Sequence, residues 1–295
     1  LFNMPSAPPL FHPRDDPGAA GWTLNGTVLG RSLDGGGGVA RMLPLYEAKM
    51  IHLYDTRWAT YEPDGSIRPM TEDEKANHLN PMPRYWVHGA DVDSKVAGRW
   101  DKNWFFGWRD ICRATDERTS ISTLLPRVAL GNKIPIAMPD CSLEQVAMLQ
   151  ATLSSFVLDF AARQKLGGIT MNYFVFMQLP VLPPGAFSRS DLPVSGGLAA
   201  WLSRRVDTLN GWIPDERDRC QVRAELDAAL FHLFGLSRDD LSYVMDSFPI
   251  VKRKDEAAFG TYQTKDLILS AYDAMAEAKS SGRTYQPPWP QEVPA

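Results

Sequence analysis

The sequence has few of the residues and patterns that mark several classes of protein. It holds three cysteines in 295 residues, with no Cys-x-x-Cys pair, so we expect free thiols in a reducing compartment and no disulfide framework. Its five histidines show no zinc-binding spacing. No uncharged apolar run approaches the roughly 18 residues that span a bilayer, and the first ten residues lack the pattern of a secretory signal. These absences predict a cytoplasmic protein without a membrane partner.

Positive charge is not in excess either. Lys and Arg number 31 against 35 Asp and Glu, which gives a net charge of −4. This balance argues mildly against a protein that coats nucleic acid, but net charge does not exclude a local basic face. With 44% hydrophobic and 22% charged residues, the composition is globular and the length suits one large or two ordinary domains. Because the chain begins at Leu1, we expect a piece of a longer polypeptide.

No complete active site is visible. A Gly-x-Ser-x-Gly elbow is missing, and no glycine-rich loop lies between a strand and a helix, as binding of S-adenosylmethionine or a nucleotide would require. Gly35 to Gly38 do not have that context. Methyltransferases that act on adenine hold the base with Asn-Pro-Pro-Tyr, but no Pro-Pro follows Asn172. We therefore expect no cofactor in this chain.

The distribution of proline, glycine and apolar residues predicts an α+β fold with a β-rich part followed by helices. Short runs of aromatic and β-branched residues, among them 104–112 and 169–177, are typical of strands. The expected parts are an irregular lead-in over 1–40, a mixed domain over 41–195, a helical segment over 196–283 and a proline-rich tail over 284–295.

The clearest predicted helix covers residues 142–166. Ser142 and Gln145 have the spacing of a capping box, and apolar residues then recur at helical period as far as Phe160. Arg163 and Lys165 fall in the last turn, where they complement the helix dipole or contact phosphate. We expect this helix to support the β-rich part.

A basic window runs from Lys95 to Lys133 and contains eight basic and four acidic residues, interleaved with aromatic ones. Lys and Arg bind phosphates, and Arg reads guanine edges. The window therefore indicates either a nucleic-acid surface or a solvated strand face with an aromatic core side. Its basic residues are Lys95, Arg99, Lys102, Arg109, Arg113, Arg118, Arg127 and Lys133.

Glu47-x-Lys49, with Asp34 upstream, allows a second interpretation. Some nucleases hold Mg²⁺ with an Asp and a Glu and use a nearby Lys to activate water. The alternative is an alternating strand whose Glu and Lys face solvent. A third interpretation is an interaction module, in which the helices of 198–280 dock a catalytic subunit.

Four ordered phrases resemble a known family. They are MLPLYEAKMIHLYDTRWATYE (42–62), GWRDICRATDERTSISTLLPRVALGNKIPI (107–136), SSFVLDFAARQKLGGITMNYFVFMQLPVLPP (154–184) and AELDAALFHLFGLSRDDLSYVMDSFP (224–249). Together they are similar to the C-terminal portion of large adenine-specific DNA methyltransferases of restriction–modification and phage-defence systems. In that family this region follows the catalytic domain and contains a target-recognition domain of TaqI-like specificity type.

The resemblance implies contact with double-stranded DNA and with an upstream methyltransferase domain of the same polypeptide. S-adenosylmethionine would bind that upstream domain, so this chain would be non-catalytic and residues 63–136 would determine specificity. It also weakens the nuclease interpretation of Glu47-x-Lys49. The expected DNA-binding residues are Lys49, Arg57, Lys95, Arg99, Lys102, Arg109, Arg113, Arg118, Lys133, Arg163 and Lys165.

Overall fold

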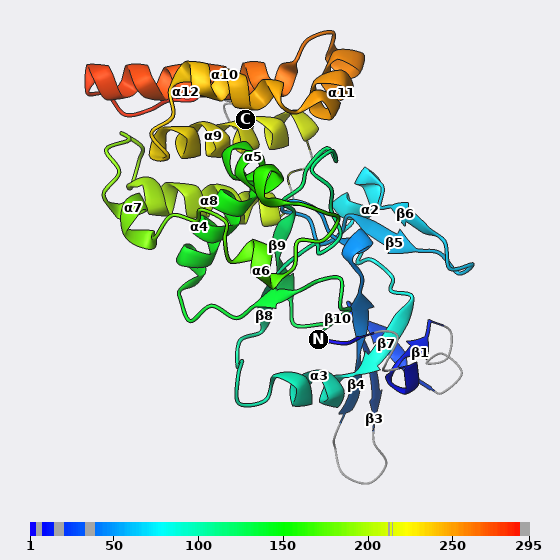
Figure 1. Cartoon of the computed structure of the whole chain (residues 1–295). Helices are drawn as coiled ribbons and strands as arrows, with labels where there is room; N and C mark the ends of the chain where they lie inside the picture. Colours follow the sequence, from blue (N-terminus) through cyan, green and yellow to red (C-terminus); the bar gives the residue numbers. More distant parts are fainter. Residues whose placement is uncertain (4–7, 15–20, 33–38, 212, 214, 290–295) are drawn as a thin grey trace. The chain divides into compact units, whose positions relative to one another are not determined.

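The computed structural model describes residues 1–3, 8–14, 21–32, 39–211, 213 and 215–289. Antiparallel sheets are followed by helices, so the α+β class is confirmed (Figure 1). The chain forms two compact units. Unit 1 comprises Leu1–Ile111 and Ser122–Pro139, and unit 2 comprises Cys112–Ile121 and Asp140–Ala295.

The main sheet of unit 1 is built around strand β4 (Val39–Tyr46). The other strands are β1 (His12–Pro13), β2 (Thr23–Asn25), β3 (Val28–Ser32), β7 (Tyr85–His88) and β10 (Ala129–Leu130), in the order β1-β7-β4-β3-β2 with β10 added to β4. All pairs are antiparallel except β10 with β4, which is parallel.

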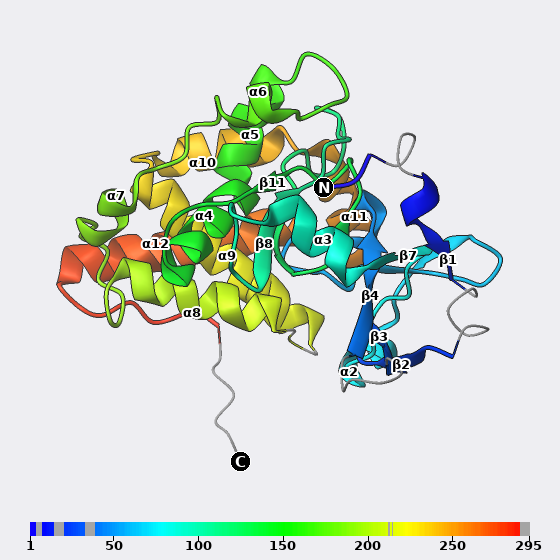
Figure 2. The same cartoon turned by 90° about the horizontal axis from the view of Figure 1, so that it is seen from below.

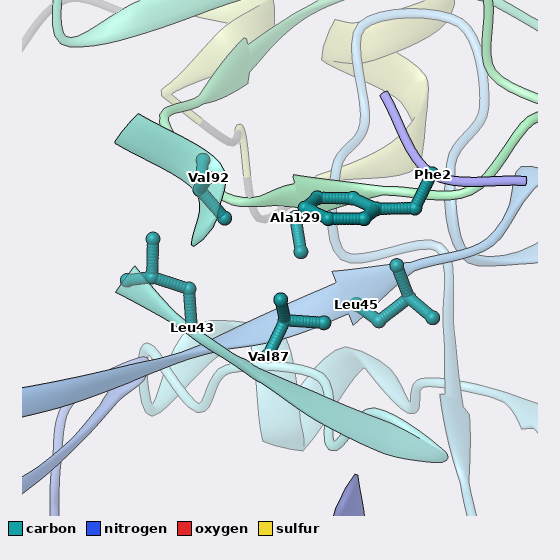
Figure 3. Packing of buried hydrophobic residues seen from close by; sticks show 6 residues of the cluster. All are labelled: Phe2, Leu43, Leu45, Val87, Val92 and Ala129. Carbon is teal, nitrogen blue, oxygen red and sulfur yellow. The ribbon is translucent and has the colours of Figure 1, made fainter. Parts of the chain in front are cut away.

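Side chains of β4 alternate between two cores because successive residues of a strand point to opposite faces. Leu43 and Leu45 pack on one face, with Val92 of helix α3 (Gly89–Val96) in the same cluster (Figure 3). Met42 packs on the other face against Trp86. The sheet is therefore buried on both sides along β4.

A smaller antiparallel sheet of unit 1 contains β8 (Trp104–Trp108), β9 (Ser122–Pro126) and β11 (Ile136–Ala137), in the order β11-β8-β9. Its central strand passes so close to its neighbours that a Cβ on Gly107 would lie 2.9 Å from side-chain atoms of both Ile134 and Leu125. The remaining elements of this unit are the hairpin β5 (Ala59–Tyr61) and β6 (Ile67–Pro69), η1 (Pro8–Leu10), η2 (Ala48–Met50) and α2 (Glu72–Ala76).

Unit 2 is helical, and its two longest helices, α9 and α12, pack against each other (Figures 1 and 2). Its helices are α4 (Leu143–Ser154), α5 (Phe156–Lys165), α6 (Tyr173–Phe176), α7 (Pro184–Ser188), α8 (Leu198–Asn210), α9 (Glu216–Leu233), α10 (Arg238–Asp246), α11 (Pro249–Phe259) and α12 (Gln263–Ser281). Within the described residues, no single helix is long and apolar enough to cross a bilayer; α4 and α5 reach that length only as a pair bent by 64°.

The helix predicted over 142–166 is in fact two helices. The capping box of Ser142 and Gln145 is present, but Ser155 is extended and its hydroxyl accepts a hydrogen bond from the Leu158 N–H, so a new helix begins there. The side-chain Oδ1 atom of Asp227 accepts a hydrogen bond from the Phe156 N–H at 2.7 Å. Because this first-turn N–H has no partner within its own helix, the side chain of Asp227 stabilises the break.

The buried strand predicted over 169–177 is wrong. The side chain of Asn172 accepts the Val175 N–H and begins the short helix α6, a local competition that Asn often wins against extended structure. Phe174 and Met177 are 77% and 78% exposed.

Two predicted boundaries also differ. Residues 1–40 are not irregular throughout, because β1, β2 and β3 lie in the main sheet. The predicted boundary at 195 is replaced by a division at residue 139, and 112–121 joins the helical unit. The helix pair α4–α5 therefore belongs to unit 2 and not to the β-rich part.

A buried carboxylate explains why 112–121 belongs to unit 2. Asp159 is fully buried. It accepts hydrogen bonds from the Nε atoms of Arg118 at 2.8 Å and Arg163 at 3.0 Å, and from the backbone N–H groups of Thr119 and Ser120. We call these five residues the Asp159 cluster. It ties the 112–121 segment to α5.

Replacing the central carboxylate should therefore destabilise unit 2. Asp159→Asn leaves two nearly buried guanidinium groups without a counter-charge, which costs about 3–5 kcal/mol of unfolding free energy in comparable cases. Urea unfolding followed by circular dichroism measures this. Asp273→Asn, which breaks an exposed pair with Arg238, is the control and should change little. Equal effects of the two substitutions would contradict the central role of the Asp159 cluster.

Asp227 should make stability depend on pH. Burial raises its pKa from 3.8 to about 7, against an opposing effect of Arg118. Because the folded-state pKa lies above the unfolded-state value, the stabilisation is complete below pH 3.8 and is lost as pH rises through about 7. The melting temperature of the wild type relative to Asp227→Asn should fall across that range. Parallel profiles would contradict this assignment.

Candidate nucleic-acid interface

The strongest candidate site is a cavity of about 240 Å³ in unit 1, which we call the basic cavity. Three separate segments line it: Glu47 to Lys49 at η2, Arg109 and Ile111 after β8, and Gly131 to Lys133 after β10. All three of its cations, Lys49, Arg109 and Lys133, are among the DNA-binding residues expected from the sequence.

Backbone hydrogen bonds bring the three segments together. The parallel pairing of β10 with β4 ends where the Gly131 N–H donates to the Tyr46 carbonyl at 3.0 Å. This bond places residues 131–133 beside η2. The Asp110 N–H donates to the Lys133 carbonyl at 3.1 Å, which adds the third segment. The cavity is therefore framed by the main chain, so its charged groups are held on a fixed scaffold.

Two of the three cations are oriented by their own partners. Arg109 donates from Nε to the Ile51 carbonyl at 2.8 Å, and Lys133 Nζ lies 3.0 Å from Asp110 Oδ2. The third cation, Lys49, is exposed to solvent. Such tethering reduces the side-chain entropy that a ligand would otherwise have to overcome.

Glu47 adds a carboxylate to this group of cations. Its Oε1 atom is buried and has no hydrogen-bond partner. Burial, followed by the charge of Glu47 and a hydrogen bond to it, raises the pKa of the Tyr61 hydroxyl well above its usual value. The carboxylate therefore has one oxygen that still lacks a donor, and an unsatisfied buried acceptor costs free energy until a donor reaches it.

A second group of predicted cations lies at the end of α3 and in the loop that follows. Lys95, Arg99 and Lys102 are all exposed, although Lys102 Nζ lies 3.3 Å from Asp101. Long exposed cations of this kind can follow a phosphate backbone without reading sequence. We call these three residues the α3 cations.

Three of the other predicted residues, Arg57, Arg113 and Lys165, lie in two different environments. Arg57 is half-buried and donates to the Lys75 carbonyl at 3.1 Å, so its main partner is the protein itself. Arg113 and Lys165 are exposed, but in unit 2. They are therefore described with unit 2, apart from the basic cavity of unit 1.

Arg118 and Arg163 require a correction. Their side chains are only 9% and 8% exposed, and both are paired with Asp159. A guanidinium group so deeply buried cannot reach a phosphate without breaking that pairing, so both arginines have structural roles. Arg163 lies in the last turn of α5, as expected for compensation of the helix dipole, and it also donates hydrogen bonds to the backbone carbonyls of Asp116 and Glu117.

The nuclease interpretation gains no support from the described residues. Asp34 lies outside them. Glu47 is the N-cap of η2 and Lys49 lies within η2, so neither residue lies on a strand. Across the described ranges, no group of three or more His, Cys, Asp or Glu side chains could hold a metal ion.

Sequence reasoning missed the contributions of Ile111, Asn132 and Tyr61 to this site. Nothing in the sequence placed Gly131, Asn132 and Lys133 next to η2, because only the pairing of β10 with β4 brings these segments together. Comparison with family models, curated proteins and solved structures gives no match.

Proposed function

We propose that this chain recognises double-stranded DNA as the specificity part of an adenine-specific DNA methyltransferase of restriction–modification or phage-defence type. The observation that carries the proposal is the convergence of Lys49, Arg109 and Lys133 from three distant segments on one cavity of unit 1. The ordered phrases of the sequence support the same conclusion. Methyl transfer and S-adenosylmethionine belong, in this proposal, to an upstream domain of the same polypeptide.

The physical requirements of such an enzyme fit this arrangement. A methyltransferase must extrude its adenine from the base stack, which costs a few kcal/mol, so a separate part has to hold the duplex and choose the sequence. Phosphate contacts set the position, whereas a few side chains near base edges set specificity. We assign the first task to the α3 cations and the second to the basic cavity.

Removing the cavity's cations should weaken DNA binding. Lys49→Ala combined with Lys133→Ala should reduce duplex affinity by about tenfold or more, since one good contact to a base edge contributes roughly 1–3 kcal/mol. Fluorescence anisotropy with a labelled random-sequence pool and with selected duplexes measures the effect.

The matched control is Lys252→Ala on α11. Its side chain is 49% exposed, as is that of Lys133, and it also lies close to a carboxylate. The control should bind like the wild type. Equal affinity of the cavity variant and the control would contradict the proposed function, as would a wild-type chain that does not bind duplex DNA.

The α3 cations should contribute through salt-dependent phosphate contacts. Lys95→Ala combined with Lys102→Ala should lower the slope of log affinity against log salt by about two, because each neutralised phosphate releases about one counterion. Affinity should fall to a similar extent for all sequences. An unchanged slope, measured by anisotropy from low to high salt, would remove the α3 cations from the DNA-binding surface.

A further inference from the structure

Helix α6 of unit 2 presents large apolar side chains to solvent. Phe174 and Met177 are 77% and 78% exposed, and Tyr173 beside them is 53% exposed. Phe174 and Met177 lie three positions apart, so they fall on one side of the helical turn. A single exposed apolar residue needs no explanation, whereas neighbouring ones of this size mark a binding surface. We call these three residues the α6 tip.

The α6 tip is held in place by the protein around it. Met171 and Leu179, which lie on either side of it in the chain, are buried. The side chain of Asn172 accepts the Val175 N–H at 3.1 Å and caps the helix. The tip lies at the margin of the helical unit, away from α12 (Figures 1 and 2). Its apolar side chains are therefore presented by an ordered turn.

The surroundings of the α6 tip are basic. Residues 160–190 contain no Asp or Glu, although 35 of the 295 residues in the chain are acidic. Lys165, in the last turn of α5, is exposed. The Cys112 N–H donates to the Ile169 carbonyl at 3.1 Å, so exposed Arg113 also lies next to the segment that leads into α6. Exposed cations on a segment without acidic side chains complement a polyanion.

The acidic residues that follow Arg113 do not oppose this charge freely. Asp116 Oδ2 accepts the Arg113 N–H at 2.9 Å, and the Glu117 carboxylate pairs with Lys254. Both carboxylates therefore have partners within unit 2, which reduces their repulsion of a phosphate.

The α6 tip by itself is far smaller than a stable interface between two protein chains. Such an interface takes about 800 Å² and roughly 20 to 30 residues from each partner. A DNA duplex needs much less, because a wedge between two base pairs requires only one or two apolar side chains. Cations beside the wedge then hold the phosphates. The combination of a small apolar tip and flanking cations therefore favours a duplex as its partner.

We propose that α6 inserts Phe174 as an apolar wedge between two stacked base pairs of the bound duplex. Met177 lies beside the wedge, and Arg113 and Lys165 contact the flanking phosphates. This inference rests on the proposed function and adds to it a DNA contact made by unit 2. Partial unstacking kinks the duplex, so binding depends on how easily the DNA deforms. The expected sites are pyrimidine–purine steps, which unstack easily.

The first experiment measures unstacking directly. The whole 295-residue chain selects a duplex from a random pool, and 2-aminopurine, which fluoresces more strongly when unstacked, replaces its bases one at a time. The wild type should raise the fluorescence at one step, and energy transfer between dyes on the two duplex ends should report a kink. Phe174→Ala combined with Met177→Ala should abolish both signals. It should also weaken binding by about tenfold, the usual effect of losing one base–aromatic contact.

Phe259→Ala is the matched control. Phe259 ends α11 in the same unit, and its side chain is 57% exposed. This variant should bind and kink the duplex like the wild type. Circular dichroism checks that all variants are folded. A double variant with wild-type affinity and the wild-type kink would overturn the inference while the proposed function stands. A wild type that binds no duplex overturns the proposed function itself.

A second measurement changes the DNA instead of the protein. A mismatch at the step that shows the signal lowers the cost of unstacking. The wild type should bind the mismatched duplex about fivefold more tightly than the matched one, whereas the double variant should bind both equally. Phe174→Leu should restore the wild-type preference, since leucine also serves as a wedge. Equal preference for the mismatch in the wild type and the double variant would assign the unstacking to another part of the chain and overturn the inference.

Two other partners of the α6 tip predict different results. If the tip joins two copies of this chain, sedimentation should show a wild-type dimer that the double variant converts to a monomer. If it binds an anionic membrane, the wild type should co-sediment with phosphatidylserine vesicles and the double variant should not. Either result, with an unchanged kink in the duplex, overturns the inference. The result expected here is that the double variant matches the wild type in both assays.

Discussion

The helical unit depends on one buried charge, the carboxylate of Asp159. Burying an ion is costly unless hydrogen bonds and opposite charges replace its water. Two arginines and two backbone N–H groups do so here. Because Arg118, Thr119 and Ser120 come from a segment that leaves unit 1 and returns to it, unit 2 is assembled from discontinuous sequence. A single carboxylate on α5 thus decides to which unit residues 112–121 belong.

The Asp159 cluster also removes Arg118 from the cations that can bind a ligand at the surface. In the sequence, Arg109, Arg118 and Lys133 belong to one basic window and cannot be told apart, but in the structure they differ in burial and in their partners. Arg118 neutralises a carboxylate inside unit 2, whereas Arg109 and Lys133 line a cavity in unit 1. Net charge over a window is therefore a poor guide to function, because structural ion pairs and binding groups contribute equally to it. A cation with a structural role is distinguished from one that can bind a ligand only by the group with which it pairs in the structure.

Structural features that depend on neighbouring residues could be predicted from the sequence, whereas features that depend on contacts between residues far apart in the chain could not. The capping box at Ser142 depends on residues three positions apart, so its pattern is visible. The break at Ser155 also needs Asp227, which no local pattern connects to it. For residues 169–177 apolar composition predicted burial, yet the hydrogen bond of Asn172 favoured a helical turn. The motif Glu47-x-Lys49 was recognised, but its cavity required the pairing of β10 with β4.

The position of Glu47 determines what kind of recognition the cavity can perform. Three cations alone would attract any phosphate and would add affinity without discrimination. A carboxylate among them lowers that general attraction and makes binding depend on a donor at one place. Specificity is a difference between affinities and is gained as much by penalising wrong partners as by favouring the right one. In the function proposed here, Glu47 beside three cations would supply such a penalty against ligands that offer only negative charge.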